Sequence, residues 1–113
     1  MSKPAEPMSP AQAVRLPEYV QYAAGSIVSR ALVQKPFGSI TLFAFDAGPG
    51  QALSEHTAPY DAYVQILDGE GEVVISGQIV NPKCGETVLI PANAPHAVNA
   101  RQRFKMLLTM IRG

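Results

Sequence analysis

Residues 85–96 read GETVLIPANAPH, and this stretch shows most clearly how the chain alternates between strand and turn. A short β-rich run at residues 87–90 lies between Gly85 and Pro91, and a turn rich in alanine and proline then leads to His96. Such a run bounded by glycine and proline is typical of a strand. The stretch therefore predicts a strand that ends at Pro91, a turn, and a second strand that begins at the histidine.

The same alternation continues along the chain from residue 26 onward. Turn signals recur about every 8–12 residues, the spacing of an all-β sandwich or barrel. The chain has ten prolines and nine glycines, spread along its length, and they leave little room for long helices. We predict an all-β domain of about eight short strands. The predicted strands are residues 27–33, 39–46, 62–67, 72–75, 78–80, 87–90, 96–100 and 104–111.

The N-terminal residues differ from this pattern. Residues 1–14 contain three prolines and lack a periodic apolar face, so they predict a mobile N-terminal arm. Residues 15–113 are then one barrel domain, because 113 residues leave no room for a second. Residues 11–24 have space for one short helix, which Pro17 would start or break.

Composition narrows the classes of partner. Nine basic residues balance nine acidic ones, and no basic run is present, which argues against nucleic acid and anionic membranes. No apolar stretch approaches the roughly 18 residues of a membrane-spanning helix, and the first residues lack the apolar core of a secretory signal. The single cysteine, Cys84, cannot form an intrachain disulfide, which favours a reducing, cytoplasmic setting.

The chain has only two histidines, and glycines and prolines frame both of them. His56 lies in residues 50–69, GQALSEHTAPYDAYVQILDG, and five residues separate it from Gly50. Five residues also separate Gly85 from Pro91 in the segment that ends at His96. These two spaced segments resemble the two motifs of the cupin superfamily. The resemblance implies a double-stranded β-helix, or jelly-roll, cupin barrel with both histidines pointing into one cavity.

The resemblance also implies a metal site, from which this sequence departs. Metal-binding cupins hold a divalent metal with three histidines and a glutamate. Ala58 and Ala62 stand at the second histidine and the glutamate positions, so His56 and His96 remain. We take Asp61 as the candidate third ligand, because two histidines and a carboxylate suit non-haem iron. The cofactor expected on this hypothesis is zinc, iron, nickel or manganese. The alternative is a metal-free pocket in which the histidines form hydrogen bonds or transfer protons.

Replacement of a histidine and a glutamate by alanine predicts a roomier and less polar cavity. Strand parity places alternate residues on the inner face, so we expect an apolar pocket for a small organic ligand. The predicted pocket residues are Ala58, Ala62, Val64, Ile66, Val98 and Met106. Two functions stay open at this point: a metal-dependent enzyme of dioxygenase, isomerase or lyase type, and a non-catalytic module that binds a small molecule.

The resemblance further implies a homodimer, because cupins commonly associate through their sheets. Residues 39–46, SITLFAFD, are apolar on both faces of the predicted strand. A second apolar face is consistent with contact between two subunits.

Overall fold

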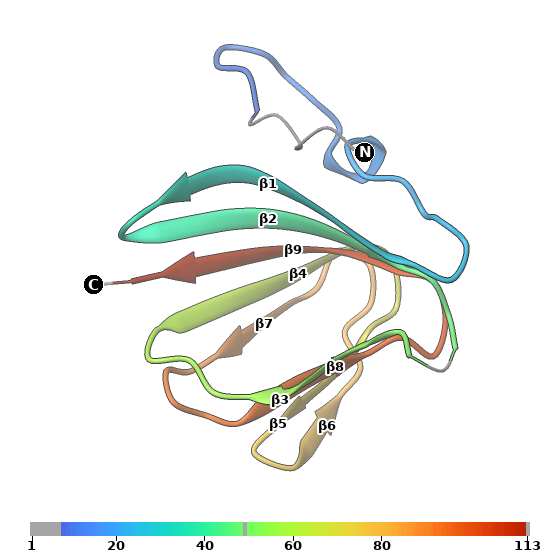
Figure 1. Cartoon of the computed structure of the whole chain (residues 1–113), viewed down its shortest axis with the longest axis vertical. Helices are drawn as coiled ribbons and strands as arrows, with labels where there is room; N and C mark the ends of the chain where they lie inside the picture. The colour runs from blue at the N-terminus through green and yellow to red at the C-terminus, as the bar shows by residue number, and fades with distance from the viewer. Residues whose placement is uncertain (1–7, 49, 113) are drawn as a thin grey trace.

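The computed structural model describes residues 8–48 and 50–112, and strands dominate it (Figure 1). One short 3-10 turn, η1 (Leu16–Glu18), precedes them. The strands are β1 (Ile27–Lys35), β2 (Gly38–Phe45), β3 (Ala52–His56), β4 (Asp61–Gly69), β5 (Glu72–Ile75), β6 (Gln78–Val80), β7 (Thr87–Ile90), β8 (His96–Asn99) and β9 (Phe104–Ile111).

The strands form two antiparallel sheets. The order in the larger sheet is β1-β2-β9-β4-β7, and in the smaller sheet it is β3-β8-β5-β6. The last strand of the chain, β9, lies between two earlier strands of the larger sheet, because it pairs with both β2 and β4. The two sheets face each other as layers (Figure 1). The predicted all-β, jelly-roll class is confirmed, and each predicted strand is present to within two residues at either end.

One strand, β3, is not among the strands that the sequence predicts. Its five residues, ALSEH, show no apolar alternation, and most of them are exposed. Pairing with β8 makes this segment a strand, with Ala52 opposite Asn99 and Leu53 opposite Val98. A polar segment of this kind becomes extended through its partner, which local sequence does not reveal.

The space between the sheets holds the main core. Phe45 of β2 stacks on Phe104 of β9, with ring centroids 4.7 Å apart and planes within 5°. Alternate residues of β4 and β9 extend this core, because side chains of a strand point to opposite faces in turn. The buried core residues are Phe45, Ala62, Val64, Ile66, Val73, Ile90, Val98, Ala100, Phe104 and Met106.

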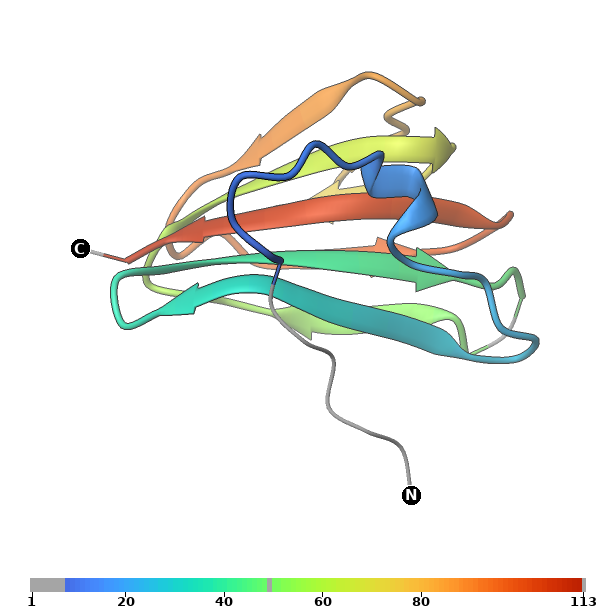
Figure 2. The ribbon, with the colours of Figure 1, turned by 90° about the horizontal axis from the view of Figure 1, so that it is seen from above.

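A second apolar cluster lies on the outer face of the larger sheet. The segment before β1 crosses this face (Figure 2), and its Val20 is 3% exposed. Leu42 and Ala44, on the outward face of residues 39–46, are buried in this cluster with Leu32 and Leu107. The chain's own N-terminal segment therefore accounts for the second apolar face of that strand, and the homodimer stays a prediction.

The predicted arm at residues 1–14 lies partly outside the described residues, since these begin at Met8. The Met8 amide donates a hydrogen bond to the Leu32 carbonyl, 3.2 Å away. Within the predicted helical region 11–24, the helix is the single turn η1, with Pro17 among its first residues. No helix among the described residues has the length and apolarity needed to span a membrane. The cytoplasmic setting stays a prediction.

Candidate functional site

The two histidines face each other across the pair β3 and β8. His56 is the last residue of β3, His96 is the first of β8, and they are register partners. Their ring centroids are 4.3 Å apart in an edge-on arrangement. His96 is 8% exposed, whereas His56 is exposed, so His56 lies nearer the solvent.

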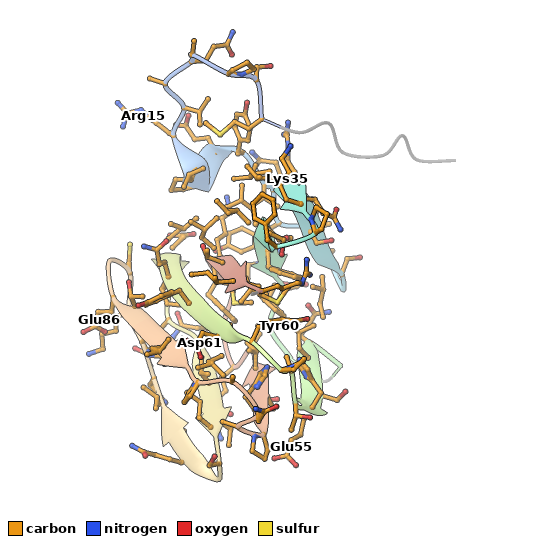
Figure 3. The ribbon with its side chains drawn as sticks, turned by 90° about the vertical axis from the view of Figure 1, so that its left-hand side faces the viewer. Arg15, Lys35, Glu55, Tyr60, Asp61 and Glu86 are labelled. Carbon is orange, nitrogen blue, oxygen red and sulfur yellow. The ribbon has the colours of Figure 1, made fainter. Side chains whose placement is uncertain are left out.

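A β-bulge makes this pairing possible. Three steps along β3 lead from Leu53 to His56, but only two steps along β8 lead from its partner Val98 to His96. In a regular ladder Glu55 would lie opposite His96, and the extra residue of the bulge replaces it with His56. Figure 3 shows Glu55 at the outer edge of the molecule.

Backbone carbonyls determine which nitrogen of each ring remains available. His56 Nδ1 lies 2.8 Å from the Ser54 oxygen, and His96 Nδ1 lies 2.9 Å from the Ala94 oxygen. A carbonyl oxygen only accepts hydrogen bonds, so each Nδ1 carries a proton and donates. In the neutral ring Nε2 then keeps a lone pair for a ligand.

A cavity of about 480 Å³ opens beside the histidines. This volume is within the range of about 300–1,000 Å³ that is typical of small-molecule sites. Apolar side chains form most of the wall. The polar groups among the described lining residues are the two imidazoles and three hydroxyls, and these residues include no Asp, Glu, Lys or Arg. The lining residues are Phe43, Leu53, Ser54, His56, Thr57, Ala58, Pro59, Tyr60, Ala62, Val64, Ile90, His96, Val98, Met106, Leu108 and Met110.

Five of the six predicted pocket residues line this cavity: Ala58, Ala62, Val64, Val98 and Met106. The sixth, Ile66, is 2% exposed and belongs to the core, two residues beyond Val64 on β4. It lies too far along the strand to reach the open space.

Asp61 lies at the rim of the cavity and is not among its lining residues. Its Oδ1 accepts a hydrogen bond from the Ala92 amide, 2.9 Å away. Beside this contact the Asn93 amide donates to the Ala58 carbonyl at 2.7 Å, and Asn93 has a φ of 67°, the left-handed conformation that asparagine tolerates. These two hydrogen bonds tie the start of β4 to the turn after β7.

The residues present do not fit the four-ligand metal set of metal-binding cupins. Within residues 8–48 and 50–112, no group of three or more His, Cys, Asp or Glu is placed to hold a metal ion. Alanine at positions 58 and 62 offers no donor atom, and Asp61 is engaged at the rim. Two imidazoles are fewer than the three protein ligands of a typical catalytic zinc site.

Some lining residues were missed from the sequence. Leu53 and Ser54 enter the cavity wall because of β3 and its bulge, for which the sequence carries no local signal. Tyr60 lies near the centre of the view in Figure 3, with Asp61 to one side of it. The Arg112 guanidinium lies 5.1 Å from the Tyr60 ring centroid and supports it from the C-terminal end of the chain.

Charged residues are paired at the other end of the sheets. Arg103 donates to Asp46 at 2.7 Å, and Arg101 donates to Glu72 at 2.6 Å. The hydrogen bond from Arg103, followed by those from the Gly25 and Ala47 amides, lowers the pKa of Asp46 to about 2. These two ion pairs therefore lie at the end of the barrel opposite the cavity, and their residues are not among its lining residues.

The chain is similar to known proteins in sequence and in fold. The family model described as Cupin domain matches residues 43–111. A conserved protein of unknown function from Streptococcus pyogenes is 32% identical, with a TM-score of 0.89 over 99% of this chain and 96% of that one. A search of the curated proteins found no match.

Two further solved structures carry the cupin name. A cupin 2 conserved barrel domain protein from Leptotrichia buccalis is 43% identical, with a TM-score of 0.80 over 85% of this chain and 46% of that one. A cupin superfamily protein from Desulfitobacterium hafniense is 24% identical, with a TM-score of 0.87 over 98% of this chain and 100% of that one, and it supports the fold alone. The family match covers more than half of the chain and agrees with the strand order and the two histidine segments: this protein belongs to the cupin family.

Proposed function

We propose that this cupin binds a small, largely apolar organic molecule in the cavity between its sheets, with His56 and His96 as the polar anchors. One observation carries the proposal: an apolar cavity of about 480 Å³ opens onto two imidazoles whose Nδ1 atoms are held by backbone carbonyls. Apolar walls with a few placed polar groups are the usual composition of a small-molecule site.

Different residues of the cavity would provide apolar contact and polar anchoring for the ligand. Phe43, Met106 and Leu108 supply apolar contact, and methionine adapts to ligands of different shape. The carbonyls of Ser54 and Ala94 orient the imidazoles before a ligand arrives. This preorganisation reduces the entropy lost on binding.

The binding test uses a panel of small aromatic molecules that share one ring and differ in their polar group: phenol, anisole, benzoate and benzylammonium. We expect at least one of them to shift the NMR signals of the Met106 and Leu108 methyl groups. Ala62→Leu fills the cavity from β4 and should weaken that binding by at least tenfold, about 1.4 kcal/mol. Ala97→Leu is the matched control, because Ala97 lies on β8 but does not line the cavity.

Two safeguards keep the test decisive. If Ala62→Leu does not fold, Ala58→Leu fills the same cavity from the half-buried rim. A panel that leaves every cavity methyl signal unchanged overturns the proposal, as does binding that both cavity-filling variants leave intact.

Metal analysis separates the binding module from the metal-dependent enzyme. The two-imidazole donor set leads us to expect less than one divalent metal per chain in untagged protein from a metal-replete culture. One equivalent of metal, lost in the double variant His56→Ala and His96→Ala, would instead favour a metal-dependent cupin enzyme.

A further inference from the structure

The polarity of the histidine pair restricts the chemistry of the ligand. Each Nδ1 donates to a carbonyl, so a neutral imidazole presents an acceptor, Nε2, and has no second donor. Among the described residues no side chain donates a hydrogen bond to either Nε2. The free site is therefore a pair of hydrogen-bond acceptors at one end of an apolar cavity.

Among the described residues, the side-chain donors in the cavity wall besides the imidazoles are the hydroxyls of Ser54, Thr57 and Tyr60, and none of them is hydrogen-bonded to this acceptor pair. His96 is 8% exposed and lines the cavity, so a ligand that fills the cavity also excludes water from it. A buried acceptor that loses water and gains no donor costs about 1–3 kcal/mol. A ligand with a suitably placed O–H or N–H avoids that cost, whereas a ligand with only acceptor atoms does not.

The absence of ionic side chains from the described cavity lining favours an uncharged ligand. The described lining residues include no Asp, Glu, Lys or Arg, so a buried carboxylate or ammonium would have no ionic partner in the cavity wall. Two charged groups named above, Asp61 at the rim and Arg112 beside the Tyr60 ring, lie outside this lining. Burial of an unpaired charge is far more costly than burial of a neutral polar group. The charged pairs Asp46–Arg103 and Glu72–Arg101 lie outside this lining.

We infer that the ligand is an uncharged molecule with an apolar body and a hydroxyl or N–H group that donates to Nε2 of His56 or His96. The inference rests on the proposed function and adds to it the class of the head group. Phenols, alcohols, enols and N–H heterocycles belong to this class. Simple ethers, carboxylates and ammonium ions do not.

The decisive comparison within the panel is phenol against anisole. The two share the ring and the oxygen, but anisole has a methyl group in place of the hydroxyl proton and is the more apolar molecule. Titrations near pH 8 keep phenol neutral, since its pKa is about 10. We expect phenol to bind at least about tenfold more tightly than anisole, and more tightly than benzoate or benzylammonium.

The variant His96→Phe keeps an aromatic ring but removes the acceptor, and the phenol preference should fall below about threefold. His56→Phe serves the same purpose at the exposed end if the first variant does not fold. Tyr60→Phe is the matched control, because it removes a cavity hydroxyl and leaves both imidazoles in place. It should preserve the preference for phenol.

The outcomes separate this inference from the proposed function. Equal or tighter binding of anisole overturns the head-group class and leaves the cavity as a binding site. Preferential binding of benzoate or benzylammonium also overturns it, in favour of a charged ligand. A preference for phenol that persists in both histidine variants assigns the acceptor to another group and overturns the role of the imidazoles. If no panel member binds, the proposed function itself fails.

Discussion

Ala58 and Ala62 leave the cavity wall without a metal-binding side chain at two positions. They stand where metal-binding cupins have a histidine and a glutamate, and both of them line the open space. The smaller alanine side chains leave more room in the cavity and offer no donor atom, which supports the proposed role of His56 and His96 as its polar anchors. Asp61, the third ligand candidate from the sequence, accepts a hydrogen bond from the Ala92 amide at the rim, and its role as a ligand stays a prediction.

At the same scale, Asp46 makes stability depend on pH. Its pKa falls from 3.8 to about 2 in the folded chain, so the folded state favours the ionised carboxylate. The resulting stabilisation is fully present above about pH 4 and is lost as the pH falls through 4 toward 2. We expect urea unfolding to show Asp46→Asn less stable than wild type at neutral pH, with the difference vanishing near pH 2. A difference that is independent of pH would show that this ionisation plays no part.

Gly69 is required for a close approach of two backbones. Its φ is +73°, and an added Cβ would collide with the Arg103 carbonyl oxygen and lie 3.1 Å from Phe104 Cβ. Gly77 has a similar φ of +84°, but nothing lies within 4 Å of an added Cβ. We expect Gly69→Ala to lower the free energy of unfolding by more than about 3 kcal/mol, against about 1 kcal/mol for Gly77→Ala. Equal costs in chemical denaturation would contradict the steric explanation.

At the scale of elements, the N-terminal segment stabilises the larger sheet as a cover. Tyr22 donates its hydroxyl proton to Asp68 at 2.6 Å, and Lys105 Nζ donates to the Pro17 carbonyl at 2.6 Å. Burial, and then the hydrogen bond to Asp68, raises the pKa of Tyr22 well above its usual value. These polar contacts surround the apolar cluster of Val20 and the outer face of the sheet.

Val20 tests the importance of this cover. Val20→Ala removes two methyl groups from a residue that is 3% exposed, and should lower the free energy of unfolding by about 2 kcal/mol. Ile79→Ala, at an exposed position of β6, is the control and should cost less than about 1 kcal/mol. Urea unfolding gives both values. A cost for Val20→Ala no larger than that of the control would mean that the segment does not stabilise the sheet.

At the scale of the whole molecule, the two ends of the barrel differ in character. The ion pairs of Asp46 and Glu72 lie at one end, and the neutral cavity lies between the sheets at the end where β3 finishes and β4 begins. The net charge of the chain is zero, and the two ion pairs are concentrated at one end of the molecule. Asp61 and Arg112 are charged residues near the cavity end, but neither is among the described lining residues.

Much of this architecture is encoded locally. The strand limits 72–75, 78–80 and 87–90 follow from β-rich runs between glycine, proline and asparagine, because turn chemistry acts over a few residues. The positions of the two histidines, and the alternation that places Val64 and Val98 on the inner faces, follow from spacing and strand parity. The sequence by itself therefore determined the all-β class, the histidine pair and part of the cavity wall.

Tertiary structure decided the rest, because those features depend on pairing between distant segments. The bulge of β3 exists only against β8, and it places His56, not Glu55, opposite His96. The rings are oriented by carbonyls whose direction follows from the folded backbone. The amide of Ala92, which lies 31 residues along the chain from Asp61, engages that carboxylate at the rim. Strand patterns are short-range, whereas the residue that lies opposite His96 and the contact of the Asp61 carboxylate depend on which distant backbone segment folds against them.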